Sequence, residues 1–465
     1  MITRSIVVNE LDEAEAKFRV LWQVLIRFKI GQALPVDVYE FQPKLARAIR
    51  RLDTIKERIA IDKNELVNNK LRYHPKWFAA RMKTLNHYLS AAHAASQIGR
   101  SLGDSFVWFF LQESKHLIKY HKEHCPTNQI PKGIGGEGEI RLLECSPRLG
   151  DYFILYHGIT SFLRIGDISL VSLVDSKLAA IGEIKTSTED KQKLLVKTFM
   201  VANRDCPLNL PAISLNKRRK NIIQLPEKYQ ARLKRQLKTM GKTITVGAPD
   251  STAEIAVSTY LSEFQSVVNS LMKNNAAYKQ CGRSMLLIGN RFRKRKLSSK
   301  LLGTKRAQTK WLDEIPERIL PIAADRDFPD ALDAKSIKIS HIVPCIVMGM
   351  TPLFWWPINA EMLQGIYFQD VAIFTAYNPA HLVQLFRSKG YMVNVYEEGR
   401  KFAASKTQQG YKLWLENIQW YFGLVEKFLF KEEAIVSIFE SLMDNIYGAN
   451  LKKSMKIEMN MMQED

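Results

Sequence analysis

Apolar residues recur at steps of three and four along the first hundred residues of the chain. Two stretches carry this pattern most regularly, one over residues 11–31 and one over residues 36–67. The apolar positions that define them are Phe18, Leu21, Trp22, Leu25 and Ile26 in the first stretch and Leu45, Ile49, Leu52, Ile55 and Ile59 in the second. This spacing is typical of amphipathic helices, and Pro35 and Pro75 separate successive helices. We therefore predict an N-terminal helical region over residues 1–102.

The pattern changes to short apolar runs between residues 164 and 187, RIGDISLVSLVDSKLAAIGEIKTS. Two largely apolar runs flank a turn-like Asp-Ser-Lys triplet, which predicts a β-hairpin. In such a hairpin Asp167 lies across from the end of the second strand. Glu183 and Lys185 are two residues apart, so their side chains point to the same face of that strand. Three charged residues therefore meet at one end of an apolar hairpin.

The elements expected around this hairpin complete a second domain. They are an apolar helix at 105–124, a glycine-rich loop within 126–150, strands at 139–145, 152–157 and 160–164, a helix beginning after residue 185, a helix at 254–273 and a buried strand at 284–289. Several prolines mark residues 205–250 as an insertion. Beyond residue 311, strand-like and helical patterns alternate. We expect a mixed α/β protein with domains at 1–102, 103–300 and 311–465.

Asp167, Glu183 and Lys185 are the residue types that metal-dependent phosphodiester cleavage uses. Two neighbouring carboxylates repel each other unless a divalent cation lies between them, and hard cations such as Mg²⁺ prefer oxygen ligands. Water on such a cation can act as the nucleophile, and a lysine can orient it or neutralise charge in the transition state. An ordinary Glu–Lys pair on a surface hairpin is the alternative, because so short a pattern also occurs by chance.

The same residues resemble the PD-(D/E)XK nuclease superfamily. Asp167, fifteen intervening residues and then Glu183-Ile184-Lys185 are similar to its motif. The resemblance implies a restriction-endonuclease-like core of order αβββαβ. It also implies that Asp167, Glu183 and the Ile184 carbonyl bind Mg²⁺ or Mn²⁺, and that Lys185 is the catalytic lysine.

Two further positions are interpreted through this resemblance. The first core helix of the family often supplies a glutamate near the metal, and Glu113 is the candidate for that role here. A solvated glutamate on the outer face of its helix is the alternative reading. Gly166 is a departure, because the residue before the motif aspartate is proline in the family's signature, although many members lack it.

Charge narrows the choice of partner. The formal net charge is +21, and two runs supply most of it. Residues 216–242 carry ten Lys or Arg against one acid, and residues 291–310 carry nine and no acid. Clustered cations favour a polyanion such as DNA, because each neutralised phosphate releases counterions. Solvated basic loops are the alternative. A membrane surface is disfavoured, because neither run has a clear aromatic-anchored amphipathic face.

Cysteine usage and the N-terminal sequence indicate the compartment. The five cysteines are far apart and form no CxxC pair, which is typical of reduced thiols. The first seventeen residues contain no apolar signal-peptide core. The prediction is a cytoplasmic protein without a membrane span.

The leading functional prediction is a metal-dependent endodeoxyribonuclease, with defence against foreign DNA or mobile-element biology as its setting. Cutting both strands of a duplex usually needs two active sites, which makes a homodimer one expected arrangement, and a partner protein is another. A non-catalytic nucleic-acid-binding or scaffold protein with a degenerate nuclease fold is the alternative. A nuclease directed at RNA is the third reading.

Overall fold

In a computed structural model, the chain forms two compact units whose segments alternate along the sequence. The N-terminal unit comprises residues 1–251, 295–302 and 347–356, and the C-terminal unit comprises residues 252–294, 303–346 and 357–465. Within these ranges the structure describes residues 1–124, 129–145, 148–149, 151–174, 177–190, 193–203, 227–244, 258–303, 338–344, 347–348, 351–396, 401–408 and 411–448.

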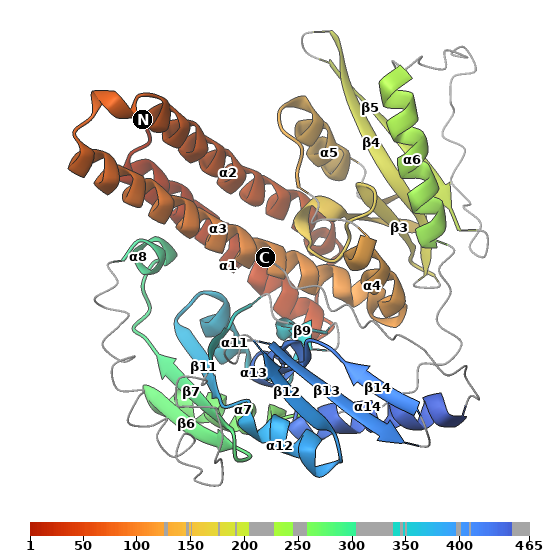
Figure 1. Cartoon of the computed structure of the whole chain (residues 1–465). Coiled ribbons are helices and arrows are strands. Elements are labelled where there is room, and N and C mark those ends of the chain that lie inside the picture. The colour runs from red at the N-terminus through yellow and green to blue at the C-terminus, as the bar shows by residue number, and fades with distance from the viewer. Residues whose placement is uncertain are drawn as a thin grey trace. The chain divides into compact units, whose positions relative to one another are not determined.

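The N-terminal unit combines a helical bundle with a five-stranded antiparallel sheet and a small two-stranded one (Figure 1). Its elements are α1 (Arg4–Lys29), α2 (Pro35–Asn68), η1 (Lys70–Arg72), α3 (Pro75–Leu111), η2 (Gln112–Ser114), α4 (Lys115–His124), α5 (Ile134–Cys145), β1 (Arg148–Leu149), β2 (Tyr152–Tyr156), η3 (His157–Ile159), β3 (Ile168–Ser172), β4 (Leu178–Asp190), β5 (Lys193–Ala202), α6 (Glu227–Ile244), α8 (Leu297–Leu301), β9 (Val347–Met348), β10 (Thr351–Pro352) and η5 (Leu353–Trp355).

The predicted helical pattern of the first hundred residues is confirmed. Helices α1, α2 and α3 pack against one another, and the predicted apolar positions Phe18, Leu45 and Ile49 are fully buried between them. Helix α3 continues through Gly103 without a break, so the expected domain boundary falls inside a helix. A Cβ on Gly103 would lie 2.0 Å from the Ile159 carbonyl oxygen, and the glycine lets the helix approach that loop.

The five-stranded sheet of this unit has the order β1-β2-β3-β4-β5, with antiparallel pairing throughout. The predicted hairpin is present as β3 and β4. Its register pairs Ile168 with Gly182, which places Asp167 opposite Glu183, as the sequence indicated.

Three predictions of local structure are wrong. Residues 139–145 belong to α5 and do not form a strand, and the glycines before them lie in its first turns. Residues 160–164 lie in the loop between η3 and β3, where the Asp104 side chain and not a neighbouring strand accepts from the Ser161 backbone N–H. The segment after Lys185 is not a helix: β4 runs on to Asp190 and pairs with β5 from Ala180 onward. Its Ser and Thr residues resemble a helix cap, but the segment pairs with β5, in which Val196 and Thr198 are β-branched and favour strand.

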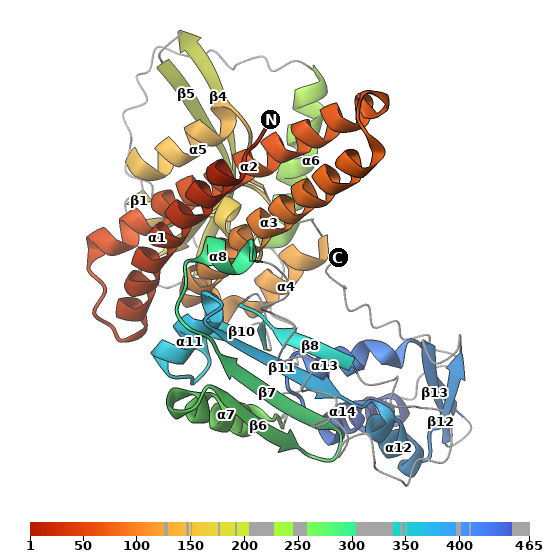
Figure 2. The ribbon, with the colours of Figure 1, turned by 90° about the vertical axis from the view of Figure 1, so that its left-hand side faces the viewer.

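Helices α5 and α6 cover opposite faces of the β4–β5 ribbon (Figures 1 and 2). Thr186 faces Gly138 of α5, whereas Ile181 packs with Met240 of α6. Side chains alternate along a strand, so the odd-numbered residues 181, 183 and 185 share the α6 face. Helix α6 occupies part of the segment that the sequence marked as an insertion, and it packs on the sheet.

The C-terminal unit is also mixed α/β. Its elements are α7 (Leu261–Lys273), β6 (Ala276–Cys281), β7 (Met285–Arg291), β8 (Lys338–Ile342), α11 (Ala360–Tyr367), β11 (Val371–Tyr377), α12 (Ala380–Ser388), β12 (Met392–Tyr396), β13 (Lys401–Gln408), β14 (Tyr411–Leu415), η7 (Ile418–Tyr421), α13 (Phe422–Glu426) and α14 (Glu432–Gly448). One antiparallel sheet has the order β6-β7-β11-β8, and a second has the order β12-β13-β14.

The predicted strand at 284–289 is β7, but its sheet is not the expected one. It pairs with β6 and β11 in the C-terminal unit and does not join the hairpin sheet. The mixed α/β class is thus confirmed, with several small antiparallel sheets. Among the described residues, no helix is both long enough and apolar enough to cross a bilayer.

Candidate functional site

Asp167 lies at the entrance to β3 and is held by the neighbouring strand. Its backbone N–H donates to the Gly182 carbonyl at 2.8 Å. Its carboxylate Oδ2 accepts from the Ile184 backbone N–H at 2.7 Å. Both contacts fix Asp167 beside the middle of β4, where Glu183 and Lys185 lie. The three residues predicted from the hairpin therefore come together.

Gly166 has a backbone conformation that explains the residue type before Asp167. Its φ is +77°, in the left-handed region. A Cβ there would lie 2.8 Å from Ile181 Cγ2 and 2.9 Å from the Gly182 carbonyl oxygen. Proline is fixed near φ −65°, so it cannot take this conformation. The backbone before Asp167 therefore excludes the proline of the family's motif.

Glu183 is buried on the α6 face of the sheet and is contacted by two nitrogen donors. Lys185 Nζ forms a short ion pair with its Oε1, and Gln236 Nε2 of α6 donates to the same oxygen at 2.8 Å. Lys185 is partly exposed, so its ammonium lies at the solvent side of the pair. Gln236 Oε1 is buried and has no hydrogen-bond partner among the described residues. An unsatisfied acceptor thus lies beside the carboxylate.

A second buried glutamate, Glu139, approaches from α5 on the other face of the sheet. Its Oε2 accepts from the Tyr156 hydroxyl at 2.6 Å. The helix can come this close because residue 138 is glycine: a Cβ on Gly138 would lie 2.3 Å from Thr186 Oγ1. Two close approaches of α5, at Gly138 and through the 3.5 Å contact of Thr186 Oγ1 with the Gly135 carbonyl, set its distance from β4.

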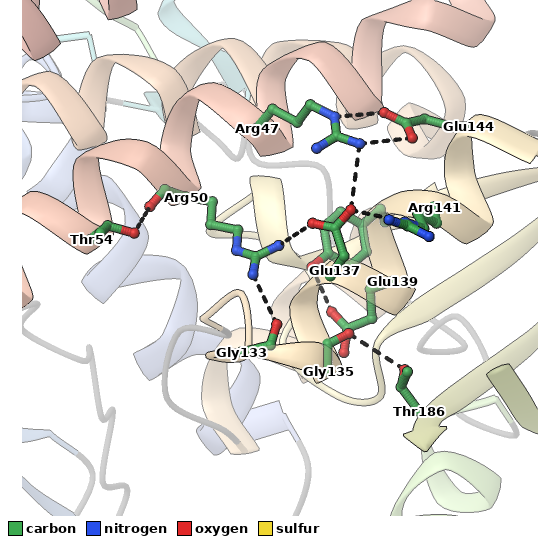
Figure 3. Close-up of polar contacts among 11 residues, drawn as sticks. Arg47, Arg50, Thr54, Gly133, Gly135, Glu137, Glu139, Arg141, Glu144 and Thr186 are labelled. Carbon is green, nitrogen blue, oxygen red and sulfur yellow. Dashed lines mark hydrogen bonds and ion pairs between the residues drawn. The ribbon is translucent and has the colours of Figure 1, made fainter. Parts of the chain in front are cut away.

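Ion pairs between α2 and α5 hold the outer face of this helix (Figure 3). Glu137 Oε2 accepts from Arg50 at 2.8 Å, and Glu137 Oε1 accepts from Arg141 at 3.0 Å. Arg47 donates to both oxygens of Glu144, at 2.6 and 2.8 Å. These glutamates point toward α2, so Glu139 on the opposite side of the helix points toward the sheet.

The electrostatics of Glu139 show that acidic groups crowd this place. Burial, together with the nearby charges of Asp167 and Glu183, raises the pKa of Glu139 to about 8, against the lowering effects of the Tyr156 hydrogen bond and of Lys185. Burial also raises the pKa of Tyr156 well above its usual value, so its hydroxyl remains a donor. With Glu139 holding its proton at neutral pH, the carboxylates of Asp167 and Glu183 and the ammonium of Lys185 leave one negative charge, which a cation would offset.

This donor set fits a hard divalent cation by its chemistry. Carboxylate and carbonyl oxygens are the ligands that Mg²⁺ and Mn²⁺ take, and the unsatisfied Gln236 Oε1 adds another oxygen beside them. In the arrangement described, Glu139 and Glu183 approach from opposite faces and Glu183 is engaged by Lys185. Accordingly, the described residues contain no group of three His, Cys, Asp or Glu side chains already arranged to hold a metal.

The loop that leads to Asp167 is fixed by buried polar groups. His157 Nδ1 contacts the Gly166 carbonyl oxygen at 2.9 Å and Nε2 contacts Ser169 Oγ at 2.8 Å, and burial lowers the pKa of His157 to about 3. A neutral imidazole can donate from one nitrogen and accept at the other, as these partners require. Asp104 of α3 accepts from the Ser161 backbone N–H at 2.6 Å and anchors the same loop.

The helix glutamate that reaches the cluster is Glu139, which the sequence patterns did not single out. Glu113 lies in η2, and its side chain is outside the described residues. The glycine cluster before Glu139 resembled a loop, which concealed the helix. Two signals were available: Glu137 and Arg141 have the i,i+4 spacing of a helical ion pair, and Gly138 permits close packing beside an acid.

The predicted basic runs are only partly described. Residues 216–226 and 304–310 lie outside the described residues. On α6, the exposed cations are Lys234, Arg235, Lys238 and Lys242, on the helix face away from the sheet. In the second run, Arg291 pairs with Glu361 at 2.7 Å and Lys296 pairs with Asp12 at 3.1 Å. Those two cations have partners within the protein, Arg293, Lys294 and Arg295 of the same run are exposed, and α6 presents an exposed basic face.

Comparisons with known proteins add no relative. A scan against protein-family models finds no matching family, and searches of curated proteins and of solved structures find no match.

Proposed function

We propose that the N-terminal unit is a metal-dependent nuclease of the PD-(D/E)XK type that hydrolyses phosphodiester bonds of DNA. The observation that carries the proposal is the gathering of Glu139, Asp167, Glu183 and Lys185 around one end of the β3–β4 hairpin. The order of elements departs from the αβββαβ core, because five antiparallel strands, β1 to β5, lie between α5 and α6.

The residues divide the chemistry between them. Asp167, Glu183 and the Ile184 carbonyl would hold Mg²⁺ or Mn²⁺, with Glu139 as a further ligand. Such a cation supplies Lewis acidity and a bound water of lowered pKa. Lys185 would neutralise charge on the phosphate or hold the attacking water. Either role requires its ammonium to break the ion pair with Glu183. Gln236 orients Glu183 through its amide hydrogen bond.

Substrate approach is supported by the exposed cations of α6. A DNA backbone lying along this helix would meet positive charge on the element that also supplies Gln236 to Glu183. Backbone contacts of this kind position a duplex without reading its sequence.

The test uses purified protein with supercoiled plasmid and with single-stranded DNA, in Mg²⁺, in Mn²⁺ and in chelator. The Glu183→Ala/Lys185→Ala variant should lose metal-dependent cutting. The matched control is Lys119→Ala/Glu123→Ala, which removes an exposed Lys–Glu pair of α4 and should cut as the unmodified protein does. Cutting that persists in the first variant refutes the site.

A second candidate function, a non-catalytic nucleic-acid-binding protein, is favoured by one observation. Lys185 neutralises Glu183 through an ion pair and Gln236 donates to the same Oε1, as expected of a carboxylate that binds no metal. Mn²⁺ binding that depends on Asp167 and Glu183 supports the nuclease, and salt-sensitive DNA binding without Mn²⁺ binding supports the alternative. Affinities for DNA and RNA of matched length separate a DNA substrate from an RNA substrate.

A further inference from the structure

The exposed edge of β2 is completed by a side chain of the helical bundle. Gln42 of α2 is 1% exposed. Its Nε2 donates to the Ile154 carbonyl at 2.6 Å, and its Oε1 accepts from the Tyr156 backbone N–H at 2.8 Å. Within the described part of the chain, β1 pairs with residues 152 and 153 of β2, and the Gln42 amide binds the backbone of residues 154 and 156 as another strand would.

The residue fixed by this contact, Tyr156, reaches across to Glu139. Its ring is buried and its hydroxyl donates to Glu139 Oε2 at 2.6 Å. The chain after β2 can fold over the ring because the next-but-one residue is glycine: a Cβ on Gly158 would lie 2.5 Å from the ring. Backbone, ring and hydroxyl of Tyr156 are therefore all held, and its position sets that of the Glu139 carboxylate.

We propose that Tyr156 is a positioning residue for Glu139, and that Gln42 carries this control back to the N-terminal helices. The inference rests on the proposed function, because it gives Glu139 a role as metal ligand. Fixing Oε2 leaves Oε1 to bind a cation in one orientation. Partners that orient a ligating carboxylate in this way usually contribute about 10- to 100-fold in metal affinity or activity.

The inference changes the role of the N-terminal helices. Helix α2 contacts the site in two independent ways. Gln42 binds the Tyr156 backbone, and Arg47 and Arg50 form ion pairs with α5. Both links end on elements that hold Glu139. Helix α2 is then part of the catalytic unit and not a separate binding module.

The experiment measures Mn²⁺ affinity calorimetrically on the full chain. Tyr156→Phe removes one oxygen and keeps the ring, and it should weaken Mn²⁺ binding at least tenfold. DNA binding in chelator should stay unchanged, and with DNA as substrate kcat should fall while KM is retained. The control is Tyr88→Phe, which removes the hydroxyl of another buried tyrosine, in α3, and should bind Mn²⁺ normally.

A double variant distinguishes the positioning role of Tyr156 from a merely structural one. In the Glu139→Gln background, Tyr156→Phe should cause no further loss of Mn²⁺ affinity, because the hydroxyl acts only through Glu139. Equal losses with and without Glu139 overturn the inference. Gln42→Met is the remote variant, and it should weaken Mn²⁺ binding in the same direction if its circular dichroism matches the unmodified protein.

The outcomes distinguish the two proposals. Mn²⁺ binding by the unmodified protein that is unaltered in Tyr156→Phe overturns the positioning role and leaves the nuclease proposal in place. Absence of Mn²⁺ binding by the unmodified protein overturns both. Loss of affinity confined to Tyr156→Phe and Gln42→Met, with Tyr88→Phe normal, supports the inference.

Discussion

Replacement of Glu139 by glutamine should stabilise the protein at alkaline pH. The pKa of this carboxyl is raised from 4.5 to about 8 by burial and by the carboxylate of Asp167. Between these values the folded state holds the proton and the unfolded state does not. The free energy of unfolding therefore falls as pH rises through this window.

The magnitude follows from the size of the shift. Each pH unit within the window costs about 1.4 kcal/mol, so the unmodified protein should lose about 4 kcal/mol between pH 5 and pH 8 through this one group. Glutamine cannot ionise, and its amide oxygen can still accept from Tyr156. The advantage of Glu139→Gln should accordingly be small at pH 5 and grow to a few kcal/mol at pH 8.

The assay is urea unfolding at pH 5, 6.5 and 8 in chelator, followed by circular dichroism. Glu144→Gln, on the exposed side of α5, is the matched control and should shift the curves by the same amount at each pH. Asp167→Asn should weaken the pH dependence, because the Asp167 charge is the largest influence on the Glu139 pKa after burial. Parallel pH profiles for the unmodified protein and Glu139→Gln would refute the reasoning.

Three further outcomes are expected. Gly138→Ala should destabilise the protein by about 1–3 kcal/mol in urea unfolding, since its Cβ meets Thr186 Oγ1, and Thr186→Ala should restore part of the loss. Gly166→Pro should unfold or misfold the hairpin, because φ +77° is closed to proline; a normal circular dichroism melt would contradict this. Replacing Lys234 and Lys238 by alanine should lower the slope of log affinity against log salt for DNA by about 0.9 for each phosphate that is no longer neutralised, and an unchanged slope would exclude α6 from the interface.

Local patterning predicted the elements whose signals lie within the element. The hairpin followed from two apolar runs around a turn, and its register placed Asp167 opposite Glu183. Helix α5 was missed because its one local signal, the spacing of Glu137 and Arg141, stands among glycines, and the other ion pairs that hold the helix come from Arg47 and Arg50 on α2.

Strand pairing was the second feature that local sequence patterns could not predict. Strand β5 carries cap-like residues before it, and only its long pairing with β4 makes it a strand. Strand β7 was identified as a strand, but its neighbour β11 lies far along the chain and no local pattern specifies that pairing. Glu139 was not identified as a site residue for the same reason, because it comes near Asp167 only after α5 has packed on the sheet.

The interleaving of the two units has a consequence for biosynthesis. Met285 of β7 pairs with Tyr377 of β11, about ninety residues later in the chain. At roughly 5–20 residues per second, translation leaves the open edge of β7 without its partner for roughly 5–20 s. Unpaired strand edges invite association with other chains. The C-terminal unit can therefore associate with other chains during synthesis, before β11 has been made. Slower translation or lower temperature during expression should change the yield of folded protein more than it changes the stability of the folded molecule.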